Sequence, residues 1–249
     1  MTSLTSSLHT PSASHGAYIQ HQIERAIDAL MASLPDPKGL TGNQRRGIIA
    51  RYSAVLEGNF IYWMTAAYLS VKSEEARSII AENLHEEVRD CHPGMLRKFA
   101  IAADAVPTDS DALAVYRELT DVRLFLGRLS AVPSVITMAF FEGFIQGFMD
   151  FLAELATDQG SLELEYTEVH GVCDIAHTQG LYRALNAEMA VNLPQPGTNL
   201  FEGVELLTAL IRTIVPAAKS TKTYPANAHS IVHGARGNAK IARLTKAEA

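Results

Sequence analysis

A long stretch of mostly apolar residues, 131–155, constrains the fold of this chain more than any other feature. About 20 consecutive apolar residues are enough to cross a bilayer. However, Glu142, Gln146 and Asp150 interrupt the stretch, and a helix that is apolar on all sides is also what the centre of a large helical domain requires. We therefore predict a buried central helix rather than a membrane span.

The rest of the chain also has helical spacing. Apolar residues recur at intervals of three and four in nearly every segment, whereas short alternating runs bounded by turn residues are scarce. No linker or internal repeat divides the segment between residues 18 and 215. The sequence thus predicts a single all-α domain of seven helices, over residues 18–34, 44–71, 74–103, 109–129, 131–155, 161–191 and 199–215.

The third predicted helix has a marked start and an interruption. Ser73 precedes Glu74 and Glu75, a pattern typical of an N-cap followed by acidic residues in the first turn. Pro93 lacks a backbone donor and disfavours helical geometry at the preceding residue. We expect the helix to bend or stop near His92 and to resume as far as about residue 103.

Composition limits the kind of partner. The chain has 27 acidic and 21 basic residues, a net charge of −6 and a pI of about 5.8. This balance argues against binding to nucleic acid or to an anionic membrane, and favours a small-molecule partner. The two cysteines are too few for a disulfide scaffold, and we expect both to be buried free thiols.

The two ends of the chain differ from the middle. Residues 1–16 are polar and have no basic start followed by an apolar run, so no secretory signal is expected. Residues 217–249 are polar and basic. We predict a disordered N-terminal tail at 1–16, a helical domain at 17–216 and a flexible C-terminal tail at 217–249. We expect a cytoplasmic protein, and for this size a homodimer.

The clearest cluster of chemically capable residues lies on the sixth predicted helix. His170, Asp174 and His177 are spaced i, i+4 and i+7 and therefore share one face. Two imidazoles and a carboxylate can converge on a metal ion, and such ligands suit iron, zinc or manganese rather than calcium. The alternative is a solvated polar face.

Glu142 is the second candidate, because it lies in the helix predicted to be most buried. An isolated ionised carboxylate would be disfavoured there, so it must protonate, pair with a cation or bind a metal. The alternatives to metal binding are a neutral, hydrogen-bonded glutamate or an ion pair with Arg123 or Arg128.

The third predicted helix supplies further candidates. His92 lies at the proline-induced bend, shortly after the adjacent carboxylates Glu86 and Glu87. Glu57, in the second predicted helix, is a single acid among apolar residues. Its alternative is a surface glutamate paired with Arg51 or Lys72. Together, at least three helices contribute carboxylates and two contribute histidines, which is the outline of a two-metal centre in a helical bundle. The paired Glu-x-x-His motifs of ferritin-like proteins are absent.

In its motif order the chain resembles the haem-oxygenase-like di-iron oxidases and oxygenases. His170, Asp174 and His177 resemble that family's His-x3-Asp-x2-His motif, Glu142 its lone glutamate and His92 its first histidine. Glu86 and Glu87 compete for the remaining carboxylate. Glu82, ten residues before His92, is a third choice, because the spacing here departs from that of known members. Glu57 resembles an extra carboxylate of some members.

The resemblance implies a seven-helix haem-oxygenase-like bundle that binds two Fe(II) ions per chain and uses O₂. It also implies oxidation of a small amino-acid-, amine- or fatty-acid-like metabolite in biosynthesis. If the substrate bears a carboxylate, Arg89 or Arg51 is a candidate to bind it. The alternatives are a metal-free or mononuclear enzyme of thiaminase-like or quinone-synthase-like activity, a small-molecule binding protein and a helical interaction module.

Overall fold

The computed structural model describes residues 12–216, which form eight α-helices, one short 3-10 helix and no β-strand. The predicted all-α single domain is confirmed. The bounds are α1 Ser12–Met31, η1 Pro37–Gly39, α2 Gly42–Ser70, α3 Glu74–Arg89, α4 His92–Ala102, α5 Asp109–Leu126, α6 Ala131–Asp158, α7 Glu165–Val191 and α8 Glu202–Ile214.

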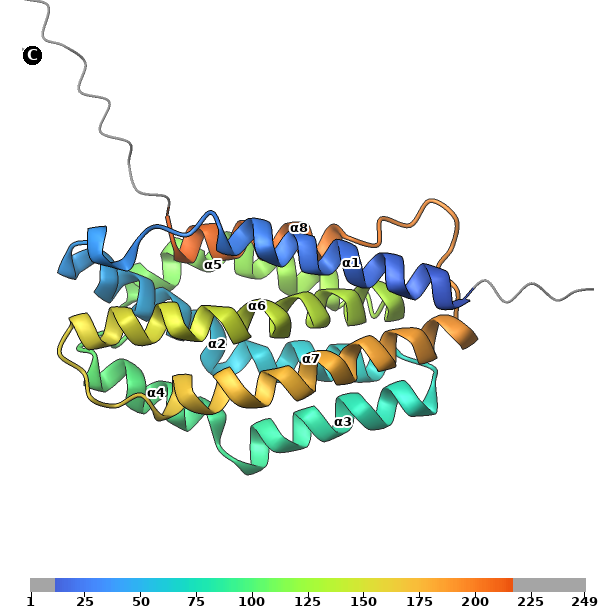
Figure 1. Cartoon of the computed structure of the whole chain (residues 1–249), viewed down its shortest axis with the longest axis horizontal. Helices are drawn as coiled ribbons and strands as arrows, with labels where there is room; N and C mark the ends of the chain where they lie inside the picture. The colour runs from blue at the N-terminus through green and yellow to red at the C-terminus, as the bar shows by residue number, and fades with distance from the viewer. Residues whose placement is uncertain (1–11, 217–249) are drawn as a thin grey trace, which may run out of the picture. The chain divides into compact units, whose positions relative to one another are not determined.

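The helix at the centre is α6, which packs against α1, α2, α7 and α8 (Figure 1). By length and composition alone this helix is apolar enough to cross a membrane, but 78% of its most apolar window is buried by the other helices. Burial on most of its sides explains why its apolar residues surround the helix rather than form one stripe. The predicted central helix is therefore confirmed.

Four of the remaining helices surround the region where the candidate residues lie. The helices α3 and α4 both pack against α2 and against α7, and α7 in turn makes its most extensive contact with α6. In Figure 1, α3, α4 and α7 are all drawn below α6, with α4 at the left and α3 at the right. The candidate residues of the third, fifth and sixth predicted helices are thereby brought to one side of the central helix.

Local capping explains several helix starts. The hydroxyl of Thr41 accepts from the backbone N–H of Gln44, whose side chain binds the Thr41 N–H in return. Ser73 caps α3 as predicted, because its hydroxyl accepts from Ala76 N at 3.3 Å. The hydroxyl of Thr108 caps α5, because it accepts from the backbone N–H of Asp111.

The break between α3 and α4 raises the number of helices from seven to eight. α3 ends at Arg89, Cys91 takes the left-handed conformation with φ 57°, and α4 starts at His92 with Pro93 in its first turn. The proline has no N–H to donate, and the first turn is where none is needed. Cys91 is exposed in this turn, so the prediction that it is buried is wrong.

The predicted N-terminal tail overlaps α1, because the helix already begins at Ser12. The rest of that tail, 1–11, and the whole predicted C-terminal tail, 217–249, lie outside the described residues.

Candidate metal centre

The helix α7 presents its three candidate residues on one buried face. His170, Asp174 and His177 are 6%, 0% and 4% exposed, so the alternative of a solvated polar face is wrong. This face lies against α3 and α6. These residues also advance along the helix axis. The structure divides them between two groups of potential metal ligands, with His170 in one and Asp174 and His177 in the other.

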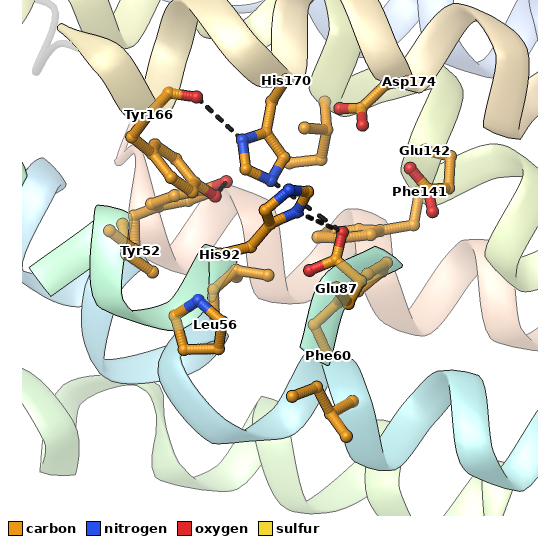
Figure 2. A pocket seen from close by; sticks show the side chains of 14 residues that line it. Tyr52, Leu56, Phe60, Glu87, His92, Phe141, Glu142, Tyr166, His170 and Asp174 are labelled. Atoms are coloured by element: carbon orange, nitrogen blue, oxygen red, sulfur yellow. Dashed lines mark hydrogen bonds and ion pairs between the residues drawn. The ribbon is translucent and has the colours of Figure 1, made fainter. Parts of the chain in front are cut away.

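The first group combines α3, α4 and α7, and contains Glu87, His92 and His170, all buried. Potential ligand atoms of the three lie within 4.8 Å of one another. Glu87 Oε1 accepts from His92 Nδ1 at 2.8 Å and lies 4.0 Å from His170 Nε2. Figure 2 shows both imidazoles directed at this carboxylate. The break after α3 makes the first contact possible, because it brings His92 back towards the last turn of α3.

The hydrogen bonds of His170 define its tautomer. Its Nδ1 lies 2.8 Å from the backbone oxygen of Tyr166, and a carbonyl oxygen can only accept, so Nδ1 carries the proton. Burial lowers the pKa of His170 to about 4. At neutral pH the ring is therefore uncharged, and its Nε2 turns a free lone pair towards Glu87, as a metal-binding histidine does.

The second group combines α6 and α7. Potential ligand atoms of Cys173, Asp174 and His177 lie within 4.8 Å of one another. Glu142, 2% exposed, reaches the same place from α6. His177 Nδ1 is 3.8 Å from Glu142 Oε2 and 3.8 Å from Asp174 Oδ1. Glu142 thus faces His177, whereas Arg123 stacks over Tyr62 and Arg128 pairs with Glu202, so the alternative of an arginine ion pair is wrong.

Three buried polar atoms in the second group lack a hydrogen-bond partner within the described part of the chain: Glu142 Oε1, Asp174 Oδ2 and His177 Nδ1. Leaving a buried donor or acceptor unpaired costs about 1–3 kcal/mol, and more for charged groups. A cation bound to these side chains would give each of the atoms a partner, in the case of His177 after loss of the Nδ1 proton. The donor set therefore fits a metal ion.

The protonation of this group has identifiable causes. Burial raises the pKa of Glu142 and, together with the charge of Glu142, raises the pKa of Asp174. Burial opposes the charge on His177, but the carboxylates of Glu142, Glu86 and Asp174 outweigh it and raise its pKa to about 10. A metal ion would have to displace this proton from the imidazole, so metal binding would be coupled to proton release.

The two adjacent glutamates of α3 go to different groups. Glu87 belongs to the first group, whereas Glu86 Oε2 lies 2.8 Å from His177 Nε2. Since an ionised carboxylate only accepts, His177 Nε2 donates this bond and Nδ1 is the nitrogen that faces Glu142. Glu86 is therefore placed to orient His177 from the outer side. Glu82 is exposed.

Three sequence candidates lie away from both groups. Glu57 is partly exposed and forms an ion pair with Arg97, rather than with Arg51 or Lys72. Arg51 donates from Nε and Nη2 to the backbone oxygen of Ile214 at the end of α8. Arg89 pairs with Asp90 at 2.7 Å and is largely exposed. The sequence shows only that these residues lie in helices, and not which way they point.

Sequence reasoning also missed residues at the site. The prediction that Cys173 is buried is also wrong, because this residue is only partly buried; its thiol donates to Asp174 Oδ1 at 3.3 Å. Burial and the neighbouring Asp174 raise the pKa of this thiol. Tyr166 and Tyr52 line the pocket beside the first group. Tyr166 could have been found, because it lies four residues before His170 on the same helix face. No sequence signal identifies Tyr52.

The protein is thus an all-helical bundle with two buried groups of His, Glu, Asp and Cys side chains that could hold metal ions. Comparison of the chain with protein-family models gives no match, and comparison with curated proteins gives none either.

Proposed function

We propose that this protein is an O₂-dependent non-haem di-iron oxidase or oxygenase with a haem-oxygenase-like fold. Its substrate is a small amino-acid-, amine- or fatty-acid-like metabolite of a cytoplasmic biosynthetic pathway. The observation that carries the proposal is the set of three unpaired buried atoms on Glu142, Asp174 and His177, adjacent along α7 to a second buried group.

Each group supplies donors for one ion. Glu87, His92 and His170 would hold the first iron, and Glu142, Asp174 and His177 the second. Nitrogen and oxygen donors of this kind suit iron. A pair of Fe(II) ions bound to these residues would supply activation of O₂, which is the oxidant of the reaction.

The chain's own residues prepare the site. The Tyr166 carbonyl keeps the His170 proton on Nδ1 and so leaves Nε2 unprotonated. Glu86 orients His177. Leu56, Phe60 and Phe141 line the adjoining pocket, and such an apolar wall limits the access of water to the reacting groups.

A mononuclear enzyme is the second candidate, and one observation favours it. Glu87 and His92 already form a hydrogen bond at 2.8 Å, whereas the second group has three buried atoms without a partner among the described residues. In this candidate one ion is held by the second group alone, and the reaction is of the thiaminase-like or quinone-synthase-like kind.

Iron loading distinguishes the two. The protein is loaded with Fe(II) without oxygen, desalted, and assayed for iron per chain and for O₂ consumption with a panel of amino acids, amines and fatty acids. We expect two irons in the wild type and about one in both His177→Ala and Glu87→Ala. The exposed His21 of α1 provides the control, since His21→Ala should keep both irons. Wild-type protein with one iron or none would refute the di-iron proposal.

A further inference from the structure

Cys173 lies at the second group, and the metal ligation proposed for that group leaves its thiol unused. It is a free cysteine and, unlike Asp174 and His177, it is only partly buried. Its sulfur lies 3.3 Å from Asp174 Oδ1. Potential ligand atoms of Cys173, Asp174 and His177 all lie within 4.8 Å of one another. The thiol is therefore close enough to share a cation with these two side chains.

The spacing of the donor atoms fits a single ion. A tetrahedral ion holds sulfur at about 2.3 Å and nitrogen or oxygen at about 2.0–2.1 Å, which places two of its donors about 3.3–3.6 Å apart. Here the sulfur is 3.3 Å from Asp174 Oδ1, and His177 Nδ1 is 3.8 Å from both Asp174 Oδ1 and Glu142 Oε2. Small movements of these side chains would bring all four donors to tetrahedral spacing.

The evidence for a cation at this place does not depend on the cysteine. Glu142 Oε1, Asp174 Oδ2 and His177 Nδ1 are buried and have no hydrogen-bond partner within residues 12–216. A divalent ion bound by two carboxylates and a thiolate would leave one net negative charge. A four-cysteine zinc site carries two, so the charge of the donor set does not exclude a thiolate.

A sulfur donor would make the two groups chemically unlike. The first group offers a carboxylate and two imidazoles, from Glu87, His92 and His170, and no sulfur. Thiolates are soft ligands that favour ions such as Zn(II), whereas carboxylates suit harder ions such as Mn(II). A thiolate in the second group would therefore change which ions that group prefers.

We infer that Cys173, as a thiolate, is the fourth ligand of the ion held by the second group. On binding, the cation forms a bond to Sγ and the thiol proton is released to solvent, with no transfer of electrons. The second group thereby becomes a site for Zn(II) and other thiolate-binding divalent ions as well as for iron. The inference rests on the proposed function in one respect, because it takes the second group as a metal site, but it requires no reaction with O₂.

Cobalt(II) reports a metal–sulfur bond directly. A thiolate bound to Co(II) gives an intense charge-transfer band in the near ultraviolet, which carboxylate and imidazole ligands do not give. Chelator-treated protein is titrated with Co(II) without oxygen and with a phosphine reductant. We expect the band in the wild type and its loss in Cys173→Ser and Cys173→Ala. Cys91→Ser, which replaces the exposed cysteine of the turn before α4, is the matched control and should keep the band.

The affinity for two unlike ions gives a second readout. Cd(II) and Mn(II) are titrated in competition with a chromophoric chelator, in a Glu87→Ala background so that the first group is not counted. Loss of the sulfur should weaken Cd(II) binding at least about tenfold, because even a residue that only supports a ligand contributes about that much. Mn(II) binding should weaken much less. A far-UV spectrum and a thermal melt verify the folding of each variant.

Three outcomes would overturn the inference. The first is a wild type that does not bind Co(II), or binds it without the band. The second is a band that persists without Cys173 or disappears without Cys91, and the third is equal weakening of Cd(II) and Mn(II). The iron content is a separate result. Two irons without a thiolate band would refute this inference alone, and the band in a protein with one iron would refute the di-iron proposal alone.

Discussion

Glu188 anchors the helix that carries Glu86 and Glu87, and its replacement gives the sharpest test of how the site is positioned. Glu188 lies on α7 and is fully buried. Its carboxylate accepts from Lys72 N and Ser73 N at 2.8 Å each, and from Asn192 Nδ2 at 2.8 Å. These backbone N–H groups lie at the start of α3, where donors have no intrahelical partner and a negative charge is favourable.

The cost of Glu188→Ala follows from these contacts. Three hydrogen bonds to a charged group are lost, and the Ser73 N–H remains buried without an acceptor, while the partly exposed Lys72 N–H regains water. Leaving a buried donor unpaired costs about 1–3 kcal/mol, and a hydrogen bond to a charged group contributes about 1.5–3 kcal/mol. Because the Lys72 N–H regains a hydrogen bond to water, we expect the free energy of unfolding to fall by about 3–5 kcal/mol. For a domain of this size, this lowers Tm by about 6–20 °C.

Thermal unfolding of the metal-free protein, followed by far-UV circular dichroism, measures the loss. Hydrogen exchange then shows which part of the fold loses stability. In the variant, the amides of residues 72–78 should exchange faster than in the wild type, and those of α6 should change less. Glu168→Ala, at an exposed position of α7, is the control and should change Tm little. A Glu188→Ala protein with the Tm of this control, and with unchanged exchange at the start of α3, would refute the reasoning.

Three further predictions concern pH, packing and ligation. Because the pKa of His177 is raised to about 10 from 6.5, its charged form stabilises the metal-free fold below about pH 6.5, and this contribution is lost as the pH rises towards 10. The difference in urea midpoint between wild type and His177→Gln should therefore shrink over that range, and a constant difference would contradict it. A Cβ at Gly203 would come within 2.5 Å of Phe125 Cε1, so Gly203→Ala should destabilise the protein by about 1–3 kcal/mol. Gly58 lies in open space on α2, so Gly58→Ala should stabilise the protein by about 0.5–1 kcal/mol. Denaturant titration checks both values. Glu57→Gln should keep the iron content of the wild type and cost at most about 1 kcal/mol, since its ion pair is partly exposed; loss of iron on elemental analysis would make Glu57 a ligand.

Much of the architecture is encoded locally and could be predicted. The apolar stretch at 131–155 predicts a central helix because no single face of it can be left in water, and α6 is that helix. Pro93 predicts the interruption that separates α3 from α4. The spacing of His170, Asp174 and His177 predicts a shared face, because helix geometry fixes the direction of each side chain relative to the next.

Contacts between helices distant in the sequence could not be predicted. Sequence reasoning left Glu86 and Glu87 as competitors for one role, whereas the packing of α3 against α7 gives each a different histidine. It treated Glu57 as a possible ligand, although α2 turns this side chain towards Arg97. Sequence reasoning gave no sign of Glu188 as the anchor of α3, because the backbone groups of Lys72 and Ser73 that it accepts from lie more than one hundred residues earlier.

The sequence by itself determined that the chain forms helices, where most of them begin and end, and which residues share a helix face. Only the tertiary structure decided which faces meet, and therefore which carboxylate reaches which imidazole. The physical reason is that backbone geometry sets side-chain directions within one helix, whereas the rotation and register of one helix against another depend on the packing of the whole core.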